Sequence, residues 1–198
     1  MRTNRAVFVL AVTGAAACAV GTRPKSGPPA GMPESHVMSM PGAGAATPSA
    51  YSAEVQAGYA KVRAATASFR VLDSAVANGY AKDVAQCFAD SIYDSGGAMG
   101  YHHVNRQYLD AKVEIEHPEI VMYERKPDGK YEMTGVEYIV PYRFWPKDSV
   151  PPKLMGRPMV QENERNYWYS HMWVWKPSSA GLFADWNPAV KCPPKAGP

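Results

Sequence analysis

The sequence predicts an α+β domain in which one long N-terminal amphipathic helix packs on a curved antiparallel sheet of about five to six strands. Between residues 52 and 78 apolar residues recur every three or four positions, the period of a helix with one buried face. Beyond Gly79 the chain changes to short runs rich in Val, Ile, Tyr, Trp and Met, separated by turn sequences. A β-sandwich or a small barrel with an accessory helix is the alternative.

The expected helix has suitable residues at both ends. Ser52 is a good N-cap, and the Asn78-Gly79 pair supplies a residue that tolerates the left-handed conformation at a helix end. After the helix, the clearest hairpin joins residues 120–124 to residues 131–140 across the turn sequence KPDGK at 126–130. Residues 99–104 and 166–175 are expected to be two further strands, and the proline-rich stretch 146–158 a loop.

The N-terminus predicts export. Arg2 and Arg5 precede a short apolar run and then small residues, so residues 1–18 are expected to be a signal peptide. The apolar run is too short to cross a membrane. Cys18 follows three alanines in a pattern that resembles a bacterial lipobox, although Ala15 stands where leucine is usual. We therefore expect a lipid anchor on Cys18, with ordinary signal cleavage beside it as the alternative.

Two further parts complete the expected domain organisation. Residues 19–50 are mostly Pro, Gly, Ala and Ser and have no hydrophobic period, so they are expected to form a disordered tether. Residues 51–198 have a normal length for a single globular domain. Within it, Cys87 and Cys192 are expected to form a disulfide, because an oxidising compartment favours pairing of two thiols. A reactive thiol at Cys87 is the alternative reading, but no base lies beside it in the sequence.

The charge of the chain excludes one class of partner. The formal net charge is +3, and a chain without Arg2 and Arg5 would carry +1. No basic tract follows the signal segment, whereas a nucleic-acid-binding domain concentrates Lys and Arg on one face. Nucleic-acid binding is therefore not expected, and contact with a membrane is expected only through the lipid anchor.

The paired histidines in GAMGYHHVN, residues 97–105, are the first candidates for chemistry. Neighbouring side chains on a strand point to opposite faces, so His102 and His103 are not expected to bind one ion. His171 and Glu137 lie on two other predicted strands. If these strands are neighbours, one histidine of the pair converges with Glu137 and His171.

Such a convergence would give a recognised set of ligands. Two imidazoles and one carboxylate bind divalent transition metals and leave coordination positions open. Glu137 is expected to share an apolar face with Met133 and Ile139, where an unpaired carboxylate is costly, so it needs a partner. Without a metal the same groups could serve acid–base chemistry, or they could form a buried structural network.

His102 is the preferred member of the histidine pair. It follows Ala98 and Gly100 on one face of the expected strand, and these small residues would leave room for a ligand. His103 is the alternative. The metal hypothesis requires the three side chains to lie within about 10 Å of one another, because bonds to a metal are only about 2 Å long.

An aromatic pocket for a small ligand is expected beside these polar groups. A row of rings on strands can line such a pocket, although it can equally belong to the core. The expected pocket residues are Tyr101, Tyr167, Tyr169, Trp173 and Trp175.

Four segments of the chain resemble a group of exported bacterial proteins without an assigned activity. They are residues 99–105 (MGYHHVN), 135–141 (GVEYIVP), 171–175 (HMWVW) and 181–188 (GLFADWNP). The resemblance covers roughly residues 69–192 and implies a single domain. It implies no catalytic residue and no cofactor.

Together these patterns predict an exported protein of the periplasm or cell envelope, anchored by lipid or else secreted. Its expected role is to bind a small ligand or a divalent metal in an aromatic pocket whose polar groups are His102, Glu137 and His171. Two other classes are kept as alternatives. One is a structural or interaction module of the envelope without a ligand, and the other is a metal-dependent or acid–base enzyme.

Overall fold

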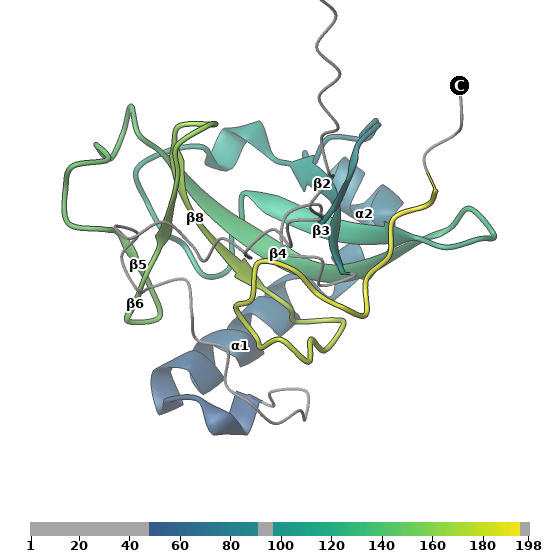
Figure 1. Cartoon of the computed structure of the whole chain (residues 1–198), viewed down its shortest axis with the longest axis horizontal. Coiled ribbons are helices and arrows are strands. Elements are labelled where there is room, and N and C mark those ends of the chain that lie inside the picture. The colour runs from purple at the N-terminus through teal and green to yellow at the C-terminus, as the bar shows by residue number, and fades with distance from the viewer. Residues whose placement is uncertain (1–47, 91–96, 195–198) are drawn as a thin grey trace, which may run out of the picture. The chain divides into compact units, whose positions relative to one another are not determined.

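Six antiparallel strands form a curled sheet, shaped like half a barrel, that separates two layers of the domain (Figure 1). The structure is a computed structural model that describes residues 48–90 and 97–194, all within the compact unit Ser39–Pro198. In spatial order the strands are β1 (Cys87–Ala89), β2 (Ala98–Val104), β3 (Ile120–Arg125), β4 (Tyr131–Pro141), β8 (Tyr167–Met172) and β7 (Val160–Glu162). A separate two-stranded sheet pairs β5 (Lys153–Leu154) with β6 (Arg157–Pro158).

Two helices occupy the segment in which the sequence predicts one. They are α1 (Ala53–Ala65) and α2 (Leu72–Ala77), separated by the 3-10 turn η3 (Ser68–Arg70); the other 3-10 turns are η2 (Pro48–Ala50) and η4 (Arg106–Tyr108). The predicted ends are confirmed, since Ser52 Oγ accepts a hydrogen bond from Val55 N and Gly79, at φ +94°, follows α2.

The break between α1 and α2 has a physical cause in the sheet beneath it. Thr66, directly after α1, donates its hydroxyl to the Val62 carbonyl at 2.7 Å, and the indole of Trp175 donates to the same hydroxyl at 3.0 Å. The Tyr123 hydroxyl of β3 donates to the carbonyl of Phe69, inside the 3-10 turn. These tertiary hydrogen bonds stabilise the break, and a helical period alone does not reveal them.

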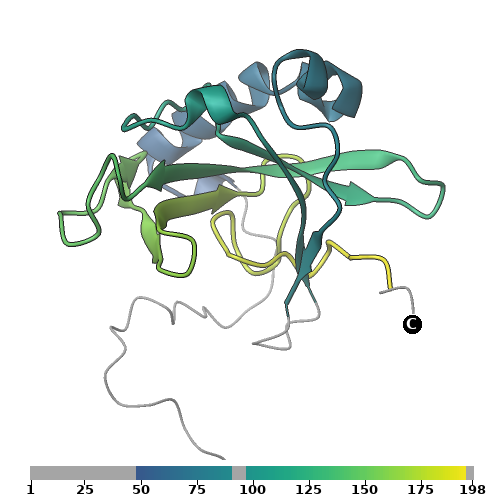
Figure 2. The ribbon, with the colours of Figure 1, turned by 90° about the horizontal axis from the view of Figure 1, so that it is seen from above.

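Each face of the sheet buries its own apolar cluster. Figure 2 shows the helices on one side of the sheet and the C-terminal segment, in yellow, on the other. On the helix side, Val55 and Val62 of α1 belong to the same cluster as Tyr123 of β3. The opposite side buries a smaller cluster, which consists of Ala98, Ile120, Met122, Ile139, Trp173 and Val190.

The predicted hairpin is confirmed, but a bulge within it changes which residues share a face. Met122 pairs with Gly135 and Tyr123 with Met133, so β4 has one extra residue there. A bulge of this kind shifts the alternation of side chains along the strand. Met133 therefore packs on the helix side, whereas Ile139 packs on the other side. The expectation that Met133 and Glu137 share a face is wrong for this reason.

The C-terminal segment is fixed beneath the sheet by covalent and polar contacts. The predicted disulfide between Cys87 and Cys192 is confirmed, with the two Cα atoms 5.7 Å apart. Asn187 exchanges two backbone hydrogen bonds with Ala98, at 3.2 and 3.1 Å. The buried Glu124 carboxylate accepts a hydrogen bond from the backbone of Lys191 at 3.0 Å. These contacts hold residues 184–192 close to β1, β2 and β3.

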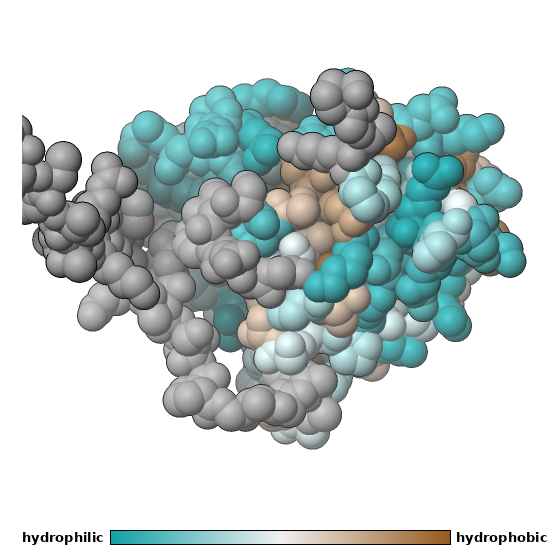
Figure 3. Space-filling model, turned by 45° about the vertical axis from the view of Figure 1, so that its right-hand side comes forward, coloured by the Kyte–Doolittle hydropathy of each residue, from teal (hydrophilic) through white to brown (hydrophobic). Residues whose placement is uncertain are grey.

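No helix among the described residues is both long and apolar enough to cross a membrane. The predicted signal peptide, Cys18 and nearly all of the predicted tether lie outside the described residues. Where it is not covered by grey atoms, the face seen in Figure 3 is mostly hydrophilic, with apolar residues gathered near its centre. The large apolar side chains exposed among the described residues are Val71, Phe144, Val150 and Val160.

Gly100 provides a test of the packing between β2 and β3. Its φ is +88°, and a Cβ placed there would lie 2.3 Å from the Tyr123 carbonyl oxygen. Gly129 has a similar φ of +83°, but its nearest neighbour would be 3.9 Å away. Gly129→Ala should cost about 1 to 2 kcal/mol of unfolding free energy through backbone strain. Gly100→Ala adds overpacking and should cost about 2 to 5 kcal/mol.

Urea unfolding of the two variants and the parent chain measures both losses. Equal losses for Gly100→Ala and Gly129→Ala would contradict the close approach of β2 to β3.

Candidate metal centre

Three side chains from three strands meet on the sheet face away from the helices. Glu137 of β4 lies directly opposite His171 of β8 in the antiparallel register. His102 reaches Glu137 from β2, across the intervening strand β3. Strands two positions apart are separated by about 9 to 10 Å in a flat sheet, so the curl of this sheet helps to close the distance.

The three side chains lie well within the separation of about 10 Å that the metal hypothesis requires. His102 Nε2 lies 3.3 Å from Glu137 Oε2, and His171 Nε2 lies 3.7 Å from Glu137 Oε1. One ligand atom from each residue lies within 4.8 Å of the others. Ligand atoms around a tetrahedral zinc ion lie about 3.4 Å apart, because each bond is about 2.0 to 2.1 Å long. A small contraction would therefore give three protein ligands the spacing that a metal requires.

The cluster is almost completely removed from solvent. The side chains of His102, Glu137 and His171 are 11%, 4% and 1% exposed. Rings enclose them: Phe88 lies edge-on to His102 at 4.9 Å between centroids, and Tyr169 lies edge-on to His171 at 5.3 Å. Trp173 stacks on His171 at 6.1 Å. Water therefore competes little for these polar groups.

Asp185 of the C-terminal segment approaches the far side of the His171 ring. Its Oδ1 atom lies 3.7 Å from His171 Nδ1, while His171 Nε2 faces Glu137. A carboxylate on the second nitrogen of a metal-binding histidine fixes the tautomer and orients the ring. Asp185 is thus placed to orient His171, and its charge together with that of Glu137 would balance a divalent cation.

Imidazole nitrogens in this cluster lack hydrogen-bond partners. Buried His102 Nδ1 and both ring nitrogens of His171 form no hydrogen bond in the described structure. An unsatisfied buried polar group costs about 1 to 3 kcal/mol, and most buried polar groups are paired. Each ring nitrogen of His171 nonetheless faces a carboxylate at 3.7 Å, Glu137 on one side and Asp185 on the other, so the contacts around this ring are electrostatic.

Burial and nearby charges shift the pKa values of the three clustered side chains. Burial, supported by the nearby His171, lowers the pKa of His102 to about 3, so this ring is neutral at pH 7 and offers a lone pair. Burial also raises the pKa of Glu137. For His171 burial alone would lower the pKa, but the carboxylates of Glu137 and Asp185 outweigh it and raise the pKa. The positive charge of Arg165 lowers the pKa of both His102 and Glu137.

His103, kept as an alternative ligand from the sequence, lies away from this cluster. Its Nδ1 atom is 2.6 Å from the Ala81 carbonyl, and its ring packs on Tyr123 and Tyr131 on the opposite face of the sheet. The separation of His102 from His103 by strand alternation is confirmed.

The expected aromatic pocket is wrong for two of its five residues. Tyr167, Tyr169 and Trp173 pack on the same side as His171. Tyr101 instead packs on Tyr131, at 5.5 Å between centroids, because it has the alternation of His103.

Trp175 is the second aromatic residue displaced from the expected pocket. Strand β8 ends at Met172, and Val174 N then donates to the Met172 carbonyl in a tight turn. This turn carries Trp175 to the helix side, where the Arg63 guanidinium lies 4.1 Å from its ring. Strand alternation cannot be extended beyond a turn that the sequence does not reveal.

The small residues before His102 do not provide space for a ligand. A Cβ on Gly97 would lie 2.7 Å from the Asn187 carbonyl oxygen, and one on Gly100 would meet the Tyr123 carbonyl oxygen. Backbone from the C-terminal segment and from β3 occupies the room that was expected to be open. That expectation is wrong, and these glycines instead allow close approach of backbone.

Comparison with protein-family models, curated proteins and solved structures gives no match for this chain. The resemblance to exported bacterial proteins noted in the sequence therefore stays a prediction. Any function must be argued from the geometry of the cluster itself.

Glu119 is a buried carboxyl group that the sequence did not identify. It is 2% exposed, and its Oε2 atom accepts a hydrogen bond from Ile139 N at 3.1 Å. It directly precedes β3, whose pairing with β4 ends at Ile120 and Glu137. The Glu119 side chain therefore reaches the β4 backbone beyond the last residue pair of the two strands. Burial raises the pKa of Glu119 to about 8, to which the charges of Asp110 and Glu137 add.

Glu119 should make the protein less stable as the pH rises. Its pKa lies near 4.5 before folding and near 8 after it, so the folded state binds the extra proton between these values. The unfolding free energy should therefore fall with pH across this window, by up to about 1.4 kcal/mol per pH unit. Glu119→Gln mimics the protonated acid and should remove this slope, whereas exposed Glu116→Gln should keep it.

Urea unfolding at several values between pH 4.5 and pH 8 measures the slope. If the unfolding free energies of the parent and of Glu119→Gln differ by the same amount at every pH, Glu119 does not titrate in this range.

Proposed function

We propose that this protein binds a divalent transition metal through His102, Glu137 and His171. The observation that supports the proposal is the convergence of their ligand atoms, within 4.8 Å, around imidazole nitrogens that lack hydrogen-bond partners. A metal ion would satisfy buried nitrogens that water cannot easily reach. Two imidazoles and a carboxylate are the ligand chemistry that zinc and iron(II) accept in proteins.

Each residue has a separate role in this proposal. The Nε2 atoms of His102 and His171 and a carboxylate oxygen of Glu137 would be the ligands, since these atoms face one another. Asp185 would orient His171 from its other nitrogen. Three protein ligands leave at least one position for water or a small ligand. His102 is the most exposed of the three, so that position would face its side of the cluster.

A structural network is the second candidate function of the same residues. The ion-pair distances of 3.3 and 3.7 Å favour it, because Glu137 would then pair directly with both histidines. In that case His102, Glu137 and His171 stabilise the sheet and the chain binds no metal. A buried ion pair broken on one side typically destabilises a protein by about 3 to 5 kcal/mol.

Elemental analysis distinguishes the two candidates. The full chain, purified without a histidine tag and incubated with equimolar Zn²⁺, should retain about one metal ion per chain after gel filtration. His171→Ala should lose the metal, because it removes a ligand that comes from a separate strand. His117→Ala is the matched control and should retain it, since His117 is an exposed loop residue that pairs with Glu114 at 3.6 Å.

Asp185→Asn refines the same test without removing a ligand. It should weaken zinc affinity by about 10- to 100-fold, as loss of a carboxylate behind a metal-bound histidine does. A parent chain that stays free of metal, with a His171→Ala variant that is merely less stable, would favour the structural network.

We further propose that the protein is exported to the cell envelope and anchored through a lipid on Cys18. Two observations support export: the N-terminal pattern of Arg2, Arg5 and a short apolar run, and the disulfide between Cys87 and Cys192. Disulfides persist in oxidising compartments and are rare in the cytosol.

Membrane fractionation of a bacterial host tests the anchor. The parent chain should partition with membranes, and Cys18→Ser should be released into the soluble exported fraction. Intact mass should differ by the added acyl chains. A parent chain that is soluble and has no added mass would exclude the anchor and leave ordinary secretion.

A further inference from the structure

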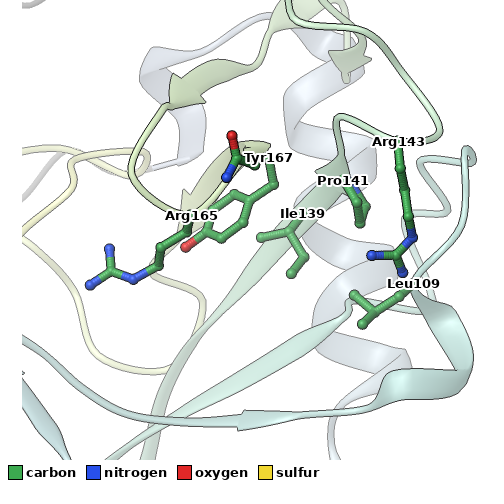
Figure 4. A pocket seen from close by; sticks show the side chains of 7 residues that line it. Leu109, Ile139, Pro141, Arg143, Arg165 and Tyr167 are labelled. Atoms are coloured by element: carbon green, nitrogen blue, oxygen red, sulfur yellow. The ribbon is translucent and has the colours of Figure 1, made fainter.

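A cavity of about 270 Å³ opens on the same sheet face as the metal centre, further along β4 and β8. Ile139, two residues from Glu137, lies in its floor, and Tyr167 belongs to the strand that carries His171. Figure 4 shows the side chains around it. The full lining is Leu109, Ile139, Pro141, Arg143, Arg165, Asn166 and Tyr167.

Two arginines line the cavity, and the guanidinium of Arg143 is the one that faces its interior (Figure 4). Arg143 is exposed, stacks on Phe144 at 4.5 Å and has no carboxylate partner among the ion pairs of residues 48–90 and 97–194. Arg165 forms an ion pair with Glu162 at 3.2 Å, and the Arg165 side chain is half exposed. Figure 4 places these two arginines on opposite sides of the cavity, with the Arg143 guanidinium directed toward Ile139 and Leu109 and the Arg165 guanidinium extending outward beyond Tyr167. The net charge at the opening therefore favours an anion.

The remaining walls are apolar. Leu109, the buried Ile139 and Pro141, and the ring of Tyr167 surround the space between the arginines. A fully hydrated inorganic ion would leave these walls uncovered, whereas an anion with an apolar body would cover them. The cavity is small and open to solvent on one side, so it suits a small ligand that is only partly enclosed.

We infer that this cavity binds a small organic carboxylate with a compact apolar body. Arg143 binds the carboxylate, since a guanidinium can offer two parallel N–H donors to it. Ile139, Leu109 and the Tyr167 ring contact the apolar body. Arg165 adds positive charge on the side that leads toward the metal centre, where its cation lies 5.5 Å from the Phe88 ring beside His102.

The inference does not depend on the metal. None of the cavity residues is among the three proposed ligands, so the cavity keeps its charge and walls in a metal-free chain. The two proposals can therefore fail separately.

Calorimetric titration of the full chain, treated with a chelator, tests the inference with three probes. Benzoate has the expected size, charge and apolar body; benzyl alcohol lacks the charge; inorganic phosphate lacks the apolar body. Benzoate should bind at millimolar concentration or below, and each of the other probes should bind at least tenfold more weakly.

Matched variants locate the binding. Arg143→Gln should weaken benzoate binding at least tenfold, because it keeps the polar stem and removes the charge. Arg125→Gln is the control and should leave the affinity unchanged, because Arg125 is exposed at the end of β3 and does not line the cavity. His171→Ala should also leave it unchanged, which separates this cavity from the metal centre.

Three outcomes would overturn the inference. Equal affinity for benzoate and benzyl alcohol would show that the arginines do not select an anion. Tighter binding of phosphate than of benzoate would assign the site to inorganic anions. Benzoate binding that survives Arg143→Gln would place the carboxylate elsewhere.

Discussion

The buried carboxylate of Glu137 lies between two imidazoles and determines which groups must surround it. It is 4% exposed, and both His102 and His171 approach it within 3.7 Å. Placing an unpaired carboxylate there would be costly, so the fold must supply cations or a metal ion. The antiparallel register provides His171 directly opposite, and the curl of the sheet brings His102 across one strand. The neutral state of His102 favours a metal, because a neutral imidazole pairs less strongly with a carboxylate.

The C-terminal segment connects the stability of the fold to this cluster. It has no regular secondary structure, yet its backbone pairs with Ala98 and its end is bound by a disulfide to β1. These attachments hold Asp185 near His171, which a free loop would not do. They also bring the Asn187 backbone so close to Gly97 that a Cβ there would lie 2.7 Å from the Asn187 carbonyl oxygen. The segment therefore places Asp185 where it can orient His171.

Strand alternation in the sequence correctly placed His102 and His103 on opposite faces, because period two is a property of any regular strand. The preference for His102 rested on open space beside Ala98 and Gly100, which backbone from β3 and the C-terminal segment fills. Strand alternation failed where the backbone is irregular. The bulge at Thr134 moved Met133 to the other face, and the turn after Met172 removed Trp175 from the aromatic set. Asp185 and Arg165 were missed because they lie outside strands, where no period relates a position to a face. The fold class depended on longer patterns and was less sensitive to single irregular residues.

X-ray absorption at the zinc edge identifies the atoms that bind the metal. The full chain loaded with one equivalent of Zn²⁺ should show scattering from two imidazoles and light-atom ligands at about 2.0 to 2.1 Å. This result would assign His102, Glu137 and His171 as the ligands, especially if one imidazole is lost in His171→Ala. A spectrum dominated by sulfur at about 2.3 Å, or one without imidazole scattering, would contradict the account.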